Sequence, residues 1–150
     1  MSSISEILAT AHARGLQRNL SYEGEVTPAE AYDLLQKAPA AKLVDVRTRA
    51  EWDFVGRIPG AIEIEWESYP DGKPNPHFVE QLRKQIDPEG LVIFICRSGN
   101  RSHHAAAAAA AAGYTQSYNV LEGFEGKKDA SDHRNTVGGW RVAGLPWSQS

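Results

Sequence analysis

The sequence has 150 residues, of which 41% are hydrophobic and 23% are charged. That length is typical of one compact domain, and the composition lies outside the disordered and coiled-coil classes. The 16 basic and 19 acidic residues give a net charge of −3, and without a dense run of Lys and Arg we expect no nucleic-acid partner.

Residues 1–21 are predicted to form an N-terminal helical extension. Ser3 and Glu6 have the spacing of a capping box, apolar residues follow at helical intervals, and Gly15 is expected to end the helix. The sequence leaves two roles open for this helix: covering the domain, or forming a dimer or partner surface.

Residues 22–147 form the predicted domain, in which helices alternate with strands. Thr27 is expected to cap a helix that has Pro28 at its first position and Glu30 at its third. Residues 91–95 are the most apolar and β-branched stretch, and they predict the central strand. The expected helices span residues 28–37, 49–54, 75–86 and 101–112, and the expected strands span residues 42–46, 61–66, 91–95 and 117–121. This alternation predicts an α/β fold, a central parallel sheet with helices on both faces and a site at the carboxyl ends of the strands.

The chain carries no pattern typical of membrane insertion or export. The longest strongly apolar run, residues 91–96, is far shorter than the roughly 20 residues that span a membrane. Residues 1–10 lack the basic and apolar regions of a signal peptide. We therefore expect a cytoplasmic protein with no membrane partner.

The only cysteine, Cys96, follows the predicted central strand and precedes an alanine-rich helix. One cysteine excludes an internal disulfide and a metal site of several thiolates. At a helix N-terminus, backbone N–H groups and the helix dipole favour a thiolate, so we expect a partly ionised nucleophile in an exposed loop. Gly99 permits the tight turn, Arg101 offers paired donors to an oxyanion, and Arg97 adds positive charge. The alternative is a buried core thiol without a chemical role.

Several short motifs occur in a fixed order along the chain. Residues 43–47, 51–52 and 56–61 are LVDVR, EW and GRIPGA, residues 96–102 are CRSGNRS, and residues 119–123 are NVLEG, followed by GW at 139–140 and AGLP at 143–146. Together they resemble the single-domain rhodaneses, the thiosulfate sulfurtransferase-like family, over about residues 22–147. The resemblance implies a rhodanese-like fold.

It also implies an activity. In such a sulfurtransferase, Cys96 would take the sulfane sulfur of thiosulfate or a similar donor as a persulfide and pass it to cyanide or a thiol, including a protein thiol. No metal and no organic cofactor are implied. The implied substrate-binding residues are Arg97, Ser98, Gly99, Asn100, Arg101 and Ser102.

The sequence departs from the family pattern at two places. Arg57 stands where the family usually has histidine, and Gly123 is followed by Phe124 where the family often has a pair of glycines. With the insertion at residues 125–138, the second departure is expected to reshape one wall of the pocket. It leaves the identity of the substrate open.

Other polar residues near the predicted strand ends have structural interpretations. For Asp45 and Arg47, a salt bridge with Glu51 that anchors the following turn is preferred to a catalytic role. His103 and His104 are expected on a solvated helix face, because adjacent helical residues point in different directions and are poorly placed to hold one metal ion.

Two alternative functions are retained. Cysteine phosphatases of the tyrosine and dual-specificity type have five residues between cysteine and arginine, whereas four separate Cys96 from Arg101. The shorter loop suits a single sulfur atom better than a tetrahedral phosphate. The other alternative is a noncatalytic rhodanese-like module that binds partners or senses redox state.

Overall fold

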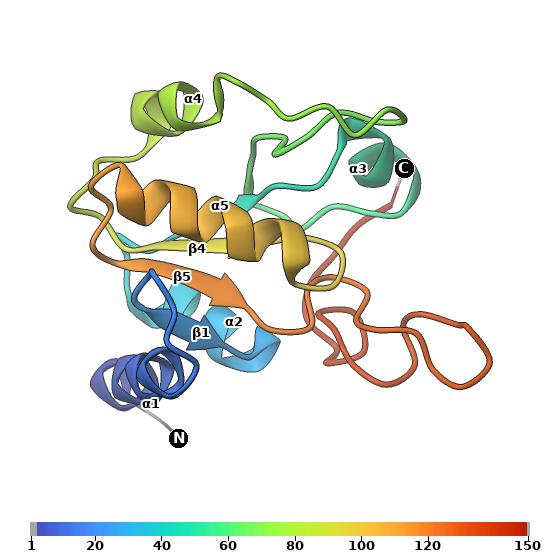
Figure 1. The fold of residues 1–150 in the computed structure, drawn as a ribbon. Coiled ribbons are helices and arrows are strands. Elements are labelled where there is room, and N and C mark those ends of the chain that lie inside the picture. The colour runs from blue at the N-terminus through green and yellow to red at the C-terminus, as the bar shows by residue number, and fades with distance from the viewer. Residues whose placement is uncertain (1–2, 150) are drawn as a thin grey trace.

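A computed structural model describes residues 3–149 and contains a five-stranded sheet of order β1-β5-β4-β2-β3 (Figure 1). Every neighbouring pair of strands is parallel. The strands are β1 (Gly24–Val26), β2 (Lys42–Asp45), β3 (Ile62–Glu63), β4 (Val92–Ile95) and β5 (Ser117–Val120). The helices are α1 (Ile4–Gln17), α2 (Pro28–Lys37), α3 (Arg49–Phe54), α4 (Phe78–Gln85) and α5 (Asn100–Ala111). The predicted α/β fold and the central position of β4 are confirmed.

Helices cover both faces of the sheet, with α4 and α5 on one side and α1 and α2 on the other (Figure 1). Side chains of β4 alternate between these layers, since successive residues of a strand point to opposite faces. Ile93 and Ile95 pack with α1 and α2, whereas Phe94 and Cys96 pack with α4 and α5. This alternation places Cys96 beneath α5.

The N-terminal helix continues past Gly15, which was expected to end it. A Cβ atom at Gly15 would lie 2.6 Å from the Glu23 carbonyl oxygen, so this glycine allows α1 to approach the chain next to β1. Ile7 and Ala11 are buried in the core on this side of the sheet. The helix therefore covers the sheet, which is one of the two roles that the sequence left open.

Local capping explains the helices whose bounds were predicted best. Thr27 and Glu30 form a reciprocal capping box at the start of α2, and Thr48 and Glu51 form another at α3. Both helices have the predicted bounds. The N-cap of α5 is Gly99, whose φ of +108° favours glycine.

Two predicted elements differ in the structure, and one strand was not predicted. Of the strand expected at residues 61–66, only β3 forms regular strand structure, because the neighbouring strand β2 ends at Asp45. Beyond β3, the Ile64 N–H still donates to the Asp45 carbonyl. Helix α4 begins at Phe78 and not at Asn75, whose side chain instead accepts from the His77 N–H in the preceding turn. Strand β1 was not predicted, since three residues are too few for a recognisable alternation.

The last part of the chain closes over the carboxyl end of the sheet. The aromatic residues here were expected to pack onto the domain. Trp140 does so, since it is buried and its indole N–H donates to the Pro146 carbonyl, whereas Trp147 is 40% exposed. Within residues 3–149, no helix is both long enough and apolar enough to cross a membrane.

Candidate active site

Cys96 lies between the central strand and the N-terminus of α5. The Gly99 N–H donates to its Sγ over 3.1 Å. Cys96 is only 1% exposed, which corrects the expectation of an exposed loop position. The cause is the alternation of β4, which continues into Cys96 and turns its side chain under α5.

Two buried polar residues complete the surroundings of the sulfur. Ser102 Oγ lies 3.2 Å from Cys96 Sγ and 2.6 Å from Asn119 Oδ1. The amide of Asn119 donates in turn to the Gly99 carbonyl over 3.2 Å. Sequence reasoning missed Asn119, although a polar residue between Tyr118 and Val120 in a buried strand was a usable signal.

Arg101 forms an ion pair with Glu51. Its Nη1 and Nη2 donate to the two carboxylate oxygens of Glu51 over 2.7 and 2.9 Å. Burial opposes the charge of Arg101, but the hydrogen bonds to Glu51 outweigh it and raise the pKa of the guanidinium. For Glu51, burial acts to raise the carboxyl pKa, but donors from Arg101 and Thr48 bring that pKa below its ordinary value.

This pairing corrects the expectation that Glu51 bridges to Asp45 and Arg47. The expected contact of Arg101 with a substrate oxyanion stays a prediction. The capping box fixes Glu51 over Thr48, and the carboxylate then meets α5, which lies 50 residues further along the chain.

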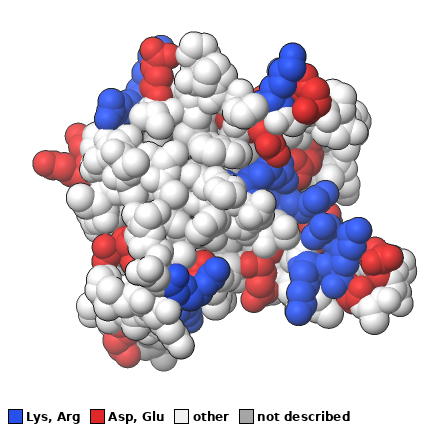
Figure 2. All heavy atoms as spheres, viewed as in Figure 1, with Lys and Arg blue, Asp and Glu red and all other residues white. Residues whose placement is uncertain are grey.

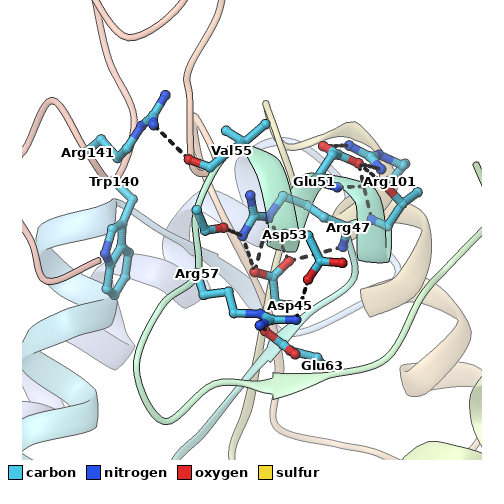
Figure 3. Close-up of polar contacts among 12 residues, drawn as sticks. Asp45, Arg47, Glu51, Asp53, Val55, Arg57, Glu63, Arg101, Trp140 and Arg141 are labelled. Atoms are coloured by element: carbon cyan, nitrogen blue, oxygen red, sulfur yellow. Dashed lines mark hydrogen bonds and ion pairs between the residues drawn. The ribbon is translucent and has the colours of Figure 1, made fainter. Parts of the chain in front are cut away.

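Asp45 and Arg47 form a separate, fully buried ion pair at the end of β2 (Figure 3). Arg47 also donates to the Gly56 carbonyl over 2.7 Å, and its guanidinium lies 4.1 Å from the centre of the Phe124 ring. These contacts join β2 to the loop after α3 and to the late segment, and they support the structural interpretation of the pair. Arg57, at the position of the family's usual histidine, pairs with Asp53.

A cleft of about 260 Å³ opens beside the cysteine loop. Arg97 is exposed there, and its side chain makes no hydrogen bond or ion pair with another residue in the described part of the chain. On this face of the molecule, Lys and Arg side chains gather near the loop after β4 and over the neighbouring late segment (Figure 2). The lining residues are Thr48, Glu51, Glu67, Ser68, Tyr69, Pro70, Gly72, Arg97 and Arg101.

The other loop residues lie on a second cleft, of about 350 Å³. Ser98, Gly99 and Asn100 line it together with Arg18 and Asn119. The six residues expected to bind substrate are therefore divided: Arg97 and Arg101 line one cleft, three line the other, and Ser102 is buried and lines neither. A larger cleft of about 420 Å³ includes no residue of the loop, so size alone does not mark the site.

The late segment packs directly against the cysteine loop. The N–H groups of Phe124 and Glu125 donate to the carbonyls of Cys96 and Arg97. Gly123 has a φ of +67°, and a Cβ atom there would lie 2.5 Å from the Cys96 carbonyl oxygen. Residues 125–138, which were expected to reshape a pocket wall, line neither of the two clefts beside the loop.

His103 and His104 differ in their surroundings. His104 is exposed, as expected, but His103 is half-buried and its Nδ1 lies 2.6 Å from the Tyr22 hydroxyl. Burial and the neighbouring His104 lower the pKa of His103. Across residues 3–149, the His, Cys, Asp and Glu side chains form no group of three or more that could hold a metal ion.

Comparisons with known proteins agree with this architecture. The sequence model of the rhodanese-like domain matches residues 27–130. The crystal structure of Rv0390 from M. tuberculosis is 47% identical in sequence, covers 86% of this chain and 99% of its own, and has a TM-score of 0.79.

Two curated relatives add to the comparison. RC0915, an uncharacterized protein of Rickettsia conorii, is 37% identical over 128 residues, which are 81% of this chain and 94% of the relative. The thiosulfate sulfurtransferase GlpE of Actinobacillus succinogenes is 31% identical over 122 residues, which are 81% of this chain and 87% of that enzyme.

Proposed function

Because this chain belongs to the rhodanese-like family, we propose that it is a sulfurtransferase that carries sulfane sulfur as a persulfide on Cys96. The observation that carries the proposal is the donation from the Gly99 N–H to Cys96 Sγ at the N-terminus of a 12-residue helix. Such a donor and the helix dipole both stabilise an anionic sulfur. The similarity to a thiosulfate sulfurtransferase supports the choice of reaction.

In the first half-reaction, the Cys96 thiolate attacks the terminal sulfur of thiosulfate. A bond forms between the two sulfur atoms, the S–S bond of thiosulfate breaks, and sulfite leaves with the bonding electron pair. The Gly99 N–H stabilises the anionic sulfur. Arg97, exposed at the mouth of the cleft, meets the donor's oxyanion, whereas Arg101 contributes positive charge from its fixed position on Glu51.

In the second half-reaction, an outside nucleophile removes the outer sulfur. Cyanide attacks that sulfur, the bond to Sγ breaks, and thiocyanate leaves while the Cys96 thiolate is restored. The 150 residues hold one cysteine, so no second thiol within the chain can discharge the persulfide as a disulfide.

The burial of Cys96 favours a donor with a slender reactive end. The thiol is 1% exposed, so a bulky group cannot place its reacting atom on Sγ without local rearrangement. Thiosulfate presents a terminal sulfur atom ahead of its three oxygens. The first acceptors to test are correspondingly small: cyanide and simple thiols.

Intact mass spectrometry tests the proposal. After incubation with thiosulfate and removal of the excess, the protein should gain the mass of one sulfur atom, and cyanide or a small thiol should remove it. Cys96→Ala should show neither the adduct nor transfer to cyanide. An unchanged mass with thiosulfate and several other sulfane donors, in protein shown to be folded, would overturn the sulfurtransferase proposal and favour the noncatalytic module.

The same preparation tests the two remaining alternatives. Turnover of a small aryl phosphate at an ordinary enzymatic rate, dependent on Cys96, would favour the phosphatase. Discharge of the persulfide mainly through a Cys96 disulfide between two chains would favour a redox sensor.

A further inference from the structure

We propose that Asn119 sets the reactivity of Cys96 by holding the hydroxyl proton of Ser102 away from the sulfur. The importance of this role for sulfur transfer rests on the function proposed above. Ser102 is fully buried and Asn119 is 3% exposed, so neither can exchange its partners for water freely. Asn119 would be a positioning residue that acts on Cys96 through Ser102.

The orientation of the Asn119 amide follows from its contacts with the Gly99 carbonyl and with Ser102. The Gly99 carbonyl can only accept, so the amide NH₂ group must face it, at 3.2 Å. The amide oxygen is then left to face Ser102 Oγ, at 2.6 Å. As this oxygen can only accept, the hydroxyl of Ser102 must donate to it.

A serine hydroxyl has one proton, so Ser102 cannot donate to Asn119 and to Cys96 through the same hydrogen. The distance to Asn119 Oδ1 is 2.6 Å, whereas the distance to Cys96 Sγ is 3.2 Å. With the proton on the Asn119 side, Ser102 turns its lone pairs toward the sulfur. Those lone pairs accept from a protonated thiol and repel an anionic sulfur.

The contact with Ser102 therefore stabilises the thiol of Cys96 more than it stabilises an anionic sulfur. A thiol completes a chain of donors from Cys96 through Ser102 to Asn119. An anionic sulfur can gain the Ser102 proton only if the hydroxyl rotates, which leaves the buried Asn119 oxygen without that donor. Asn119 thus favours the thiol in the resting protein, and it leaves an anionic persulfide with less stabilisation and a greater tendency to give up its outer sulfur.

Other charged and titratable groups lie on the elements around the cysteine loop. The loop and the start of α5 contribute two arginines, α3 contributes a carboxylate, and the end of β2 contributes an ion pair. The second cleft contributes an arginine, two carboxylates and a histidine, and a tyrosine contacts that histidine. These groups are Arg97, Arg101, Glu51, Asp45, Arg47, Arg18, Glu25, Glu122, His103 and Tyr22. Of these groups, Tyr22 also has a side-chain hydrogen bond with Asn119, whereas the ion pairs of Glu51 with Arg101 and of Asp45 with Arg47 do not involve it. A substitution at Asn119 removes the contact with Tyr22 equally in the presence and absence of the Ser102 hydroxyl, so a comparison of those two backgrounds isolates the effect of Ser102.

The pH dependence of Cys96 alkylation tests the proposal without any sulfur donor. Because Cys96 is the only cysteine, iodoacetamide reports on it alone. Asn119→Leu, which keeps a similar volume and removes the acceptor, should lower the pH of half-maximal alkylation rate by about one unit, since the freed Ser102 proton can bond the thiolate. In the background of Ser102→Ala, the same substitution should cause no shift. An unchanged or upward shift in the single variant, or an equal downward shift in both backgrounds, would overturn the proposal.

Two further measurements protect the test against loss of folding. Asn119→Val, which suits a strand, should behave as Asn119→Leu does. In the unaltered protein, the Raman S–H stretching band of the single thiol should lie at the lowered frequency of a hydrogen-bond donor, and Ser102→Ala should move it to the frequency of a free thiol. A free-thiol band in the unaltered protein would contradict the proposed chain.

The results also separate this inference from the proposed function. If the alkylation profiles behave as expected while no sulfane donor loads Cys96, the role of Asn119 stands and the sulfurtransferase proposal fails. If Cys96 accepts and delivers sulfur but the profile of Asn119→Leu matches that of the unaltered protein, the function stands and this inference fails.

Discussion

The ion pair between Glu51 and Arg101 should be a main contributor to the stability of the site. Each side chain is 17% exposed, and two hydrogen bonds of 2.7 and 2.9 Å join them. Removing one partner of a fully buried pair costs about 3–5 kcal/mol, whereas exposed pairs contribute about 0–1 kcal/mol. For this mostly buried pair we expect Glu51→Gln or Arg101→Met to lower the free energy of unfolding by about 3 kcal/mol, with a coupling energy of about 2 kcal/mol between them.

Urea unfolding of the two single variants and the double variant, followed by circular dichroism, gives that coupling energy as a double-mutant cycle. Glu51→Gln is chosen because its side-chain oxygen can still accept from the Thr48 N–H, so the cap of α3 is kept. A matched cycle on the exposed pair of Lys73 and Asp71, with Lys73→Met and Asp71→Asn, should give a coupling energy of no more than about 0.5 kcal/mol.

A coupling energy for Glu51 and Arg101 equal to that of the exposed control pair would refute the reasoning. It would mean that the attraction between these two side chains is no stronger than between the exposed ones. A loss of the cooperative transition in Arg101→Met alone would instead show that the guanidinium is needed to build the cysteine loop, and Arg101→Lys would then test whether charge without the paired geometry restores it.

Three further predictions follow from the same contacts. Arg97→Gln should raise KM for thiosulfate about tenfold and leave the free energy of unfolding within about 0.5 kcal/mol, because its exposed guanidinium has no partner in the described part of the chain; an unchanged KM would remove it from donor binding. Gly123→Ala should lower the free energy of unfolding in urea by at least about 2 kcal/mol, since its Cβ atom overlaps the Cys96 carbonyl oxygen in addition to the strain of a positive φ. Gly60→Ala, at a φ of +82° with open space around the Cβ atom, should lower it less, and an equal loss in both variants would contradict the overlap. The pKa of Glu51 in the folded protein is lowered below its ordinary value of 4.5, so its contribution to the free energy of unfolding is complete above that value and is lost as the pH falls through the folded-state pKa. In urea titrations from about pH 6 to about pH 3, the free energy of unfolding should therefore fall more steeply for the unaltered protein than for Glu51→Gln.

The sequence by itself determined the elements that depend on neighbouring residues. The capping pattern at Thr27 fixed the start of α2, and the apolar β-branched run at residues 91–95 identified the central strand. The order of strand, cysteine, glycine and helix also placed Cys96 between β4 and α5, because a strand end and a helix N-terminus are both local features of the chain. The family resemblance carried by residues 96–102 agrees with the match over residues 27–130.

The tertiary structure alone decided which distant groups meet. Glu51 lies beside Thr48 in sequence, but its pairing with Arg101 depends on where α3 and α5 rest against the sheet. The burial of Cys96 and its connection through Ser102 to Asn119 likewise depend on strands β4 and β5 lying side by side. Periodicity shows which face a side chain occupies, whereas its hydrogen-bond partner is set by how separate elements pack. For that reason the sequence placed Cys96 at a strand end but did not identify its buried neighbours Ser102 and Asn119 as a connected pair.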